Sequence, residues 1–201
     1  MRQHLPNAIT LSRLVGIPVL LLWMHFAESD EFLPIALFFL FLAGTDALDG
    51  YLARRLDVVS DFGKLLDPLV DKILIVAPLV TLVGFRSEVT GDPWVPSVMV
   101  NVLIAREFWV TGVRGVAASR GIVVAASDLG KLKTVFQVAA VFFLFLHDQK
   151  LFQIGEAWVT GQYFGLQCLI TAIVIAYWSG IEYTLLVFRG MRGSFHQDSS
   201  L

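Results

Sequence analysis

The sequence contains a single cysteine and few charged residues. Cys168 alone excludes an internal disulfide and a metal cluster built on cysteine thiolates. Only 16% of the 201 residues are charged, whereas soluble domains carry about 25%. Hydrophobic residues make up 56% of the chain, and the mean hydropathy is +0.71. This balance is typical of an integral membrane protein and argues against an ordinary soluble domain.

Long polar stretches, internal repeats and low-complexity linkers are also missing. We therefore expect one membrane domain over residues 1–201, with no separate soluble domain. The first apolar segment follows Arg2 and is interrupted by Arg13, and no small-residue cleavage site follows it. This pattern differs from that of a secretory signal peptide, so we expect the segment to be retained as a helix.

Six apolar segments are long enough to cross a bilayer. About 20 apolar residues span the hydrocarbon core as a helix, and lipid requires helices because every backbone polar group needs an internal partner. The predicted fold is an all-α integral membrane protein whose six transmembrane helices cover residues 5–27, 32–53, 65–85, 94–118, 130–146 and 164–188. The stretch GQYFG (161–165) matches a GxxxG helix-packing pattern, and residues 193–201 read as a frayed polar tail.

The charges in the connections predict the orientation of the bundle. One set of connections is acidic or mixed, at residues 28–31, 86–92 and 147–150. The other side carries the positive charge, from Arg2, Arg54, Arg55, Lys64, Arg114, Arg120, Lys131, Lys133, Arg189 and Arg192. The positive-inside rule makes this second side cytoplasmic, with both termini inside.

Four aspartates occupy the inner ends of the second and third apolar segments. Asp46 and Asp49 are three residues apart, and Asp67 and Asp71 are four apart, so each pair shares one face of a helix. The connection is short, so we expect antiparallel neighbouring helices with all four carboxylates at one end. A charge at membrane depth costs about 2.5–3.5 kcal/mol. Such acids therefore indicate a function.

Divalent cations would compensate these four carboxylates. Ionised carboxylates repel one another when they lie close together. Hard oxygen ligands without nearby cysteine or histidine favour Mg²⁺ or Mn²⁺, and we expect two ions. Metal ions at the membrane boundary can neutralise a pyrophosphate and its leaving phosphate. The alternative is a set of salt bridges to Arg54, Arg55, Lys64 and Lys72, which fits four acids at paired helical spacing less well.

Small and basic residues accompany the acids. Gly50 and Ala53 follow the first pair and let a ligand approach the helix backbone closely. Arg54 lies at the same end, where it can bind a phosphate oxygen. Gly63 leaves room again just before the second pair. These residues predict a phosphorylated lipid as the ligand.

The motif resembles the signature of the CDP-alcohol phosphotransferase family. It reads Asp46-x-x-Asp49-Gly50-x-x-Ala53-Arg54, followed after eight, three and three residues by Gly63, Asp67 and Asp71. The resemblance implies a six-helix membrane fold and transfer of a phosphatidyl group from a CDP-linked lipid to an alcohol, with release of CMP. It also implies that the four aspartates hold the metals and that Asp71 is the base. Gly50, Ala53, Arg54, Ser60 and Gly63 would bind the CDP-lipid.

Cations in the fourth and fifth segments indicate which kind of alcohol is the acceptor. Arg106 and Arg114 lie two turns apart on one helix, and Lys131 and Lys133 begin the next. Together they would place positive charge beside the aspartates and bind an acceptor that carries its own phosphate. The alternatives are a buried pair of Arg106 with Glu107 and anchoring of the two lysines at the membrane interface.

Three further segments, LPNAITLSR, IAREFWVTGVR and GKLKTVFQ, resemble the phosphatidylglycerophosphate synthase branch of the family. That resemblance implies CDP-diacylglycerol and sn-glycerol 3-phosphate as substrates. It further implies a homodimer in the cytoplasmic membrane of a bacterium, with the active site facing the cytoplasm, and no nucleic acid is expected as a partner. Asn7, Thr10 and Arg13 would lie near the nucleotide or lipid phosphate. Their alternative is an N-cap followed by a snorkelling arginine.

Two other functions stay open at this point. The same chemistry could use another acceptor, either phosphatidylglycerol, as in cardiolipin synthesis, or inositol phosphate. A cation-coupled membrane carrier is the alternative from another class, although the sequence shows no inverted repeat of the kind that carriers often have. Glu182, inside the sixth segment, is an acid without an evident partner, and Arg106 is one cation with which it could pair.

Overall fold

A computed structural model describes the backbone over residues 5–28, 31–56, 61–122, 128–155 and 157–198. It describes side chains over residues 13–28, 31–45, 68–122, 129–155 and 158–191. Within these ranges the chain forms six helices and one two-stranded sheet. In chain order they are α1 (Leu5–Phe26), α2 (Phe32–Leu56), α3 (Asp61–Leu82), α4 (Ser97–Ser119), α5 (Asp128–Phe145), β1 (Lys150–Ile154), β2 (Ala157–Thr160) and α6 (Gly161–Asp198).

Each of the six apolar segments forms one helix, so the prediction of six helices is confirmed. The antiparallel hairpin β1–β2 lies in the connection for which the sequence pattern offered no assignment. Helix α6 continues through Asp198, so the predicted frayed tail is wrong up to that residue. The last turns contain no proline, and a helix that is already nucleated adds residues at little cost.

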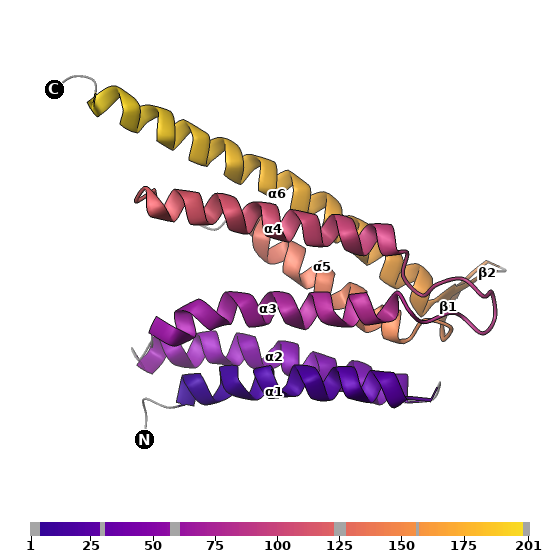
Figure 1. Cartoon of the computed structure of the whole chain (residues 1–201). Coiled ribbons are helices and arrows are strands. Elements are labelled where there is room, and N and C mark those ends of the chain that lie inside the picture. Colours follow the sequence, from indigo (N-terminus) through magenta and orange to yellow (C-terminus); the bar gives the residue numbers. More distant parts are fainter. Residues whose placement is uncertain (1–4, 29–30, 57–60, 123–127, 156, 199–201) are drawn as a thin grey trace.

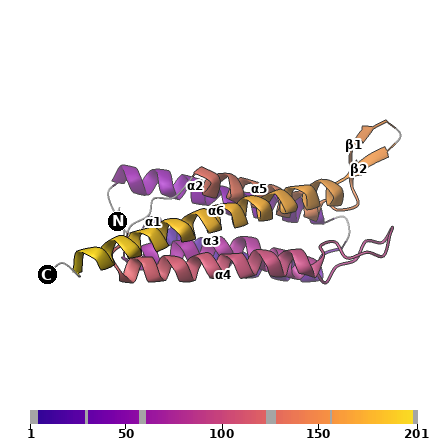
Figure 2. The same cartoon turned by 90° about the horizontal axis from the view of Figure 1, so that it is seen from above.

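The helices run side by side in an elongated bundle (Figures 1 and 2). Helix α1 begins and α6 ends at one end of this bundle, which we call the terminal end. The β1–β2 hairpin projects from the opposite, or hairpin, end (Figure 1). Helices α2 and α4 end, and α3 and α5 begin, toward the terminal end (Figure 1). The helix segments that carry the aspartate pairs and the predicted acceptor cations therefore lie toward this terminal end.

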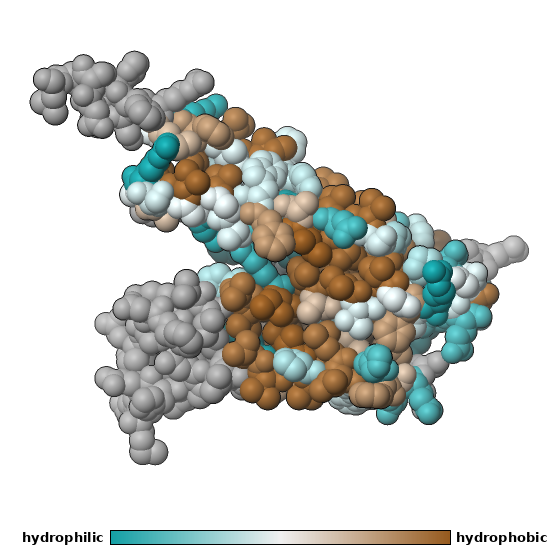
Figure 3. All heavy atoms as spheres, in the orientation of Figure 1, coloured by the Kyte–Doolittle hydropathy of each residue, from teal (hydrophilic) through white to brown (hydrophobic). Residues whose placement is uncertain are grey.

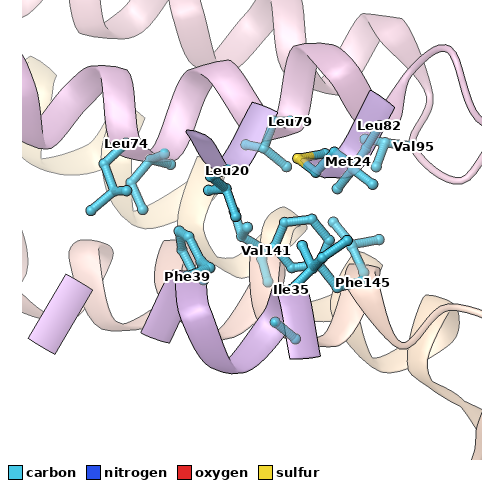
Figure 4. Packing of buried hydrophobic residues seen from close by; sticks show 14 of the residues in the cluster. Leu20, Met24, Ile35, Phe39, Leu74, Leu79, Leu82, Val95, Val141 and Phe145 are labelled. Atoms are coloured by element: carbon cyan, nitrogen blue, oxygen red, sulfur yellow. The ribbon is translucent and has the colours of Figure 1, made fainter. Parts of the chain in front are cut away.

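The described hydrophobic core lies mainly in the hairpin half of the bundle (Figure 4). Helix α1 packs against both α2 and α3, and α2 packs against α5. Fully buried side chains from all four helices meet there, including Leu20, Ile35, Leu79 and Phe145. Burying a side chain of this size stabilises a fold by about 1.5–3 kcal/mol. This apolar half fixes the helices whose other halves carry the polar residues.

Helices α5 and α6 approach each other closely at two glycines. A Cβ atom at Gly161 would lie 2.5 Å from the carbonyl oxygen of Leu146, and one at Gly165 would lie 2.8 Å from Cγ of Leu144. Only residues without a side chain fit such a contact. The predicted GxxxG packing is therefore confirmed.

Polar contacts fix the connections at the hairpin end. Ser87 Oγ donates a hydrogen bond to Asp148 Oδ1 (2.8 Å) and so joins the α3–α4 connection to the end of α5. His147 stacks on Trp94 with ring centroids 3.3 Å apart. Burial lowers the pKa of His147 and outweighs the opposite effect of the neighbouring Asp148 carboxylate. The imidazole is therefore neutral in the folded protein at neutral pH.

Large apolar side chains cover the outside of the bundle (Figure 3). Every helix exposes some of them, for example Leu22, Leu37, Val80, Phe108, Val135 and Trp178. Soluble monomers rarely expose apolar surface this extensively. Of the helices in the described ranges, α6 is long and apolar enough to cross a membrane, over Gly161–Met191, while the apolar stretches Arg13–Phe26 and Phe32–Thr45 are shorter.

Because α5 and α6 are in close contact, we expect one added methyl group at this contact to destabilise the protein. We expect Gly165→Ala to lower the free energy of unfolding by about 1–3 kcal/mol, because Leu144 must move to admit the new Cβ. Gly115→Ala on α4 is the matched control: nothing lies within 4 Å of its Cβ position, and alanine favours the helix by about 1 kcal/mol. Thermal unfolding in detergent measures both, and equal melting temperatures would contradict the packing.

Candidate active site

A cavity that several charged side chains line lies between α3, α4, α5 and α6 in the terminal half of the bundle. Its volume is about 420 Å³. In Figure 3 a hollow opens at the terminal end below α4 and α6, and hydrophilic side chains line its upper wall. Asp71 lines this cavity together with all four cations predicted to bind the acceptor phosphate, Arg106, Arg114, Lys131 and Lys133. The structure thus brings five predicted site residues from three helices into one space.

The helical repeat explains why these side chains face the cavity. On α4, Arg106, Val110 and Arg114 line it at intervals of four residues. On α5, Lys133 and Gln137 do the same. Residues three and four apart lie on one face of a helix, so each helix presents a stripe of polar side chains to the same space.

Asp71 is held by an arginine from the first helix. Arg13 Nη1 donates a hydrogen bond to Asp71 Oδ1 at 2.7 Å, and the arginine side chain is only 1% exposed. The Asp71 side chain is 44% exposed, so its carboxylate also reaches the cavity. A buried arginine does not snorkel to the membrane interface, so that alternative for Arg13 is wrong.

Arg106 and Lys133 share one carboxylate. Glu107 Oε1 accepts hydrogen bonds from Lys133 Nζ at 2.6 Å and from Arg106 Nη1 at 3.1 Å. All three side chains are buried, with 7–12% of each exposed. The alternative pairing of Arg106 with Glu107 is therefore present, and the same arginine still lines the cavity. The 12% exposure of Lys133 excludes interface anchoring for this lysine.

Helix α6 completes the support of Arg106. Arg106 Nε donates to the carbonyl oxygen of Ala176 at 2.7 Å, and Nη2 donates to Ser179 Oγ at 2.9 Å. The guanidinium group is thus fixed in its plane by α6 and by Glu107. Glu182 is not its partner, which corrects the pairing considered from the sequence. A guanidinium held in this way loses little further freedom on binding an anion.

Lys72 was considered from the sequence only as an alternative ion-pair partner of the aspartates, and Thr111 and Tyr183 were not predicted as cavity residues. Lys72, next to Asp71, donates from Nζ to Thr111 Oγ1 at 2.6 Å, and Thr111 Oγ1 donates to the carbonyl oxygen of Glu107 at 2.6 Å. Arg114 lies over the ring of Tyr183, 5.7 Å from its centroid. The signal that could have found these residues was helical spacing, because Lys72 is three residues from Ile75 and Thr111 is four residues from Glu107 on the cavity faces of their helices.

The remaining predicted residues are described in part or not at all. Ser60 lies outside the described residues. Side chains are also outside the described part for nine residues whose backbones are helical, Asn7 and Thr10 on α1, Asp46, Asp49, Gly50, Ala53 and Arg54 on α2, and Gly63 and Asp67 on α3. Their helical backbones keep the predicted spacing of the aspartate pairs. Among the described side chains, no group of three potential metal ligands lies together.

Comparison with known proteins identifies the family to which this chain belongs. The model of the CDP-alcohol phosphatidyltransferase family matches residues 3–183. This match covers most of the chain, and the chain therefore belongs to that family of membrane enzymes. The family resemblance of the aspartate motif is thus confirmed.

Individual relatives extend the comparison. The CDP-diacylglycerol–glycerol-3-phosphate 3-phosphatidyltransferase of Bacillus subtilis is 44% identical over 157 residues, which cover 72% of this chain and 78% of that protein. The protein of the same name from Pectobacterium atrosepticum is 32% identical over 185 residues, covering 91% and 94%. The cardiolipin synthase (CMP-forming) of rice is 32% identical over 192 residues, covering 92% of this chain and 57% of that protein.

The shared carboxylate predicts a specific pattern of stability. Glu107→Leu leaves Arg106 and Lys133 as two buried cations without their common acid, and we expect it to lower the free energy of unfolding by about 3 kcal/mol. Adding Lys133→Met should restore part of this loss, because one uncompensated charge is then removed. Thermal unfolding in detergent of both variants gives the comparison. A double variant less stable than Glu107→Leu alone would contradict the ion triad.

Proposed function

We propose that the chain transfers the phosphatidyl group of CDP-diacylglycerol to sn-glycerol 3-phosphate, giving phosphatidylglycerophosphate and CMP. The observation that carries this proposal is the cavity, in which Asp71 faces the four acceptor cations. The relatives from Bacillus subtilis and Pectobacterium atrosepticum, which carry the name of this activity, support it.

The cavity suits a small acceptor that bears a phosphate. Of the four cations that line it, Arg106 is buried and Lys133 is only 12% exposed, whereas Arg114 and Lys131 are exposed. Arginine binds phosphate oxygens through parallel N–H groups, and lysine supplies a point charge. Serine, choline and free inositol carry no phosphate for these four side chains to bind. We assign these four residues to the acceptor phosphate.

Asp71 is the group placed to handle the attacking hydroxyl. The acceptor oxygen forms a bond to the lipid-side phosphorus, the bond from that phosphorus to CMP breaks, and the hydroxyl proton passes to a carboxylate oxygen of Asp71. Arg13 donates a hydrogen bond to Oδ1 of this carboxylate and so fixes the orientation of the second carboxylate oxygen. A carboxylate beside cations is a weak base, so orientation of the hydroxyl is its larger contribution.

The donor set of the aspartates fits a hard divalent cation. Asp46, Asp49, Asp67 and Asp71 offer only carboxylate oxygens, at helical positions that keep each pair on one face. Bound Mg²⁺ or Mn²⁺, with two ions proposed, would neutralise the pyrophosphate of the donor. For the CDP-lipid we propose Asn7, Thr10, Arg13, Gly50, Ala53, Arg54, Ser60 and Gly63.

We further propose six membrane spans with both termini in the cytoplasm. Exposed apolar side chains on all six helices support the spans. The terminal end carries Arg114, Lys131 and the predicted basic connections, which the positive-inside rule assigns to the cytoplasm. Since the named bacterial relatives include several species, we place the protein in a bacterial cytoplasmic membrane. A homodimer remains part of the proposal.

Transfer to phosphatidylglycerol is the second candidate, favoured by the match to the rice cardiolipin synthase over 92% of this chain. A cation-coupled carrier is disfavoured, because the polar residues form a cavity at one end that is rich in cations. CMP release that depends on both lipid and alcohol separates the enzyme from the carrier.

The test is CMP release by purified protein in detergent with CDP-diacylglycerol, Mg²⁺ and a panel of acceptors. We expect turnover with sn-glycerol 3-phosphate and none with phosphatidylglycerol or inositol phosphate. Asp71→Asn should lower kcat at least about 100-fold, because the amide neither accepts the hydroxyl proton nor orients the hydroxyl as the carboxylate does, while the melting temperature shows whether the variant is folded. Glu88→Ala, in an exposed connection at the hairpin end, is the control.

Turnover with another acceptor alone would overturn the assignment of the substrate. A folded Asp71→Asn protein with the activity of the Glu88→Ala control would overturn the role of Asp71.

A further inference from the structure

Glu182 on α6 lines the cavity and has no role in the proposed phosphatidyl transfer. Helix α6 lines the cavity with Ser179, Glu182, Tyr183 and Leu186. These positions follow one another at intervals of three, one and three residues, so they form a single helical face. Ser179 supports Arg106, and Tyr183 lies under Arg114. Glu182 is the carboxylate that this face presents to the cavity.

The three described acids of the cavity differ in their partners. Asp71 is bonded to Arg13, and Glu107 is bonded to both Arg106 and Lys133. Glu182 makes no ion pair among the described residues, although several cations line the same cavity. It is also exposed, so water or a ligand can reach its oxygens.

An acid in a phosphate-binding cavity works against phosphate binding, because like charges repel. An ionised carboxylate only accepts hydrogen bonds. A hydroxyl of the bound molecule can donate such a bond, and this gain offsets the repulsion. sn-Glycerol 3-phosphate carries one hydroxyl that reacts and a second, on its central carbon, that does not. The second hydroxyl is the group that matches an acceptor-only side chain on a separate wall.

We propose that Glu182 accepts a hydrogen bond from the non-reacting secondary hydroxyl of the acceptor and so determines acceptor specificity. This inference rests on the proposed function, because it names one more contact within the same acceptor site. Asp71 on α3 faces the reacting hydroxyl, the cations on α4 and α5 face the phosphate, and Glu182 on α6 faces the central carbon. Contacts from three walls also distinguish the two enantiomers of a glycerol phosphate.

The experiment compares two acceptors that differ by the hydroxyl in question. sn-Glycerol 3-phosphate has it, and 3-hydroxypropyl phosphate lacks it while keeping the phosphate and a primary hydroxyl. A hydrogen bond to a charged group corresponds to roughly a 10- to 100-fold preference. We expect the wild type to prefer sn-glycerol 3-phosphate in kcat/KM by this factor, and Glu182→Ala to reduce the preference to about one.

Two further variants sharpen the comparison. Glu182→Gln keeps an oxygen acceptor without the charge, so it should keep an intermediate preference. Glu88→Ala removes an acid at the hairpin end and should keep the wild-type preference. The wild type should also prefer sn-glycerol 3-phosphate over sn-glycerol 1-phosphate, and Glu182→Ala should narrow that preference.

The possible results separate this inference from the proposed function. A wild type that releases no CMP with sn-glycerol 3-phosphate would overturn the proposed function itself. If the wild type is active, a Glu182→Ala protein that retains the wild-type preference would overturn the role of Glu182. Equal losses with both acceptors would also overturn it, since a purely structural role lowers both activities alike.

Discussion

One carboxylate oxygen makes it possible for this apolar bundle to bury two cations. Glu107 Oε1 accepts from Arg106 on its own helix and from Lys133 on α5, while Arg106 reaches α6 through Ala176 and Ser179. Removing Glu107 from this group leaves both cations without their common acid, at a cost of about 3–5 kcal/mol. The triad and the bonds of Arg106 therefore tie together α4, α5 and α6, three of the helices that line the cavity. The relative position of these helices depends on them.

The two halves of the bundle carry different tasks. In the hairpin half, apolar side chains of α1, α2, α3 and α5 fill the core, and Gly161 and Gly165 bring α6 against α5. In the terminal half, hydrogen-bonded ion pairs replace apolar packing, as with Arg13 and Asp71. Polar groups are costly to bury unless they are paired. A rigid apolar half allows the other half to keep a hydrated cavity between helices without collapsing into it.

The sequence predicted the elements of this arrangement better than its contacts. The six helices followed from apolar segments of sufficient length, and helical spacing placed Arg106 and Arg114 on one face of α4. The partner of Arg13 could not be predicted, because Asp71 is 58 residues away and periodicity says nothing about which helices touch. The same limit applies to the triad, where Lys133 lies 26 residues from Glu107. The hairpin escaped prediction because its two short strands depend on the helices that hold their ends together.

The charge of the cavity argues for one type of acceptor. Its described walls carry five cations, Lys72, Arg106, Arg114, Lys131 and Lys133, and three carboxylates, Asp71, Glu107 and Glu182. Four of these cations, Arg106, Arg114, Lys131 and Lys133, are the proposed ligands of a phosphate. A phosphate monoester carries about −1.5 to −2 at neutral pH, whereas the phosphodiester of phosphatidylglycerol carries a single negative charge and brings two acyl chains. A small phosphorylated alcohol therefore matches the proposed phosphate ligands and is small enough for the cavity, and the proposed contact of Glu182 on α6 is with its hydroxyl rather than with its phosphate.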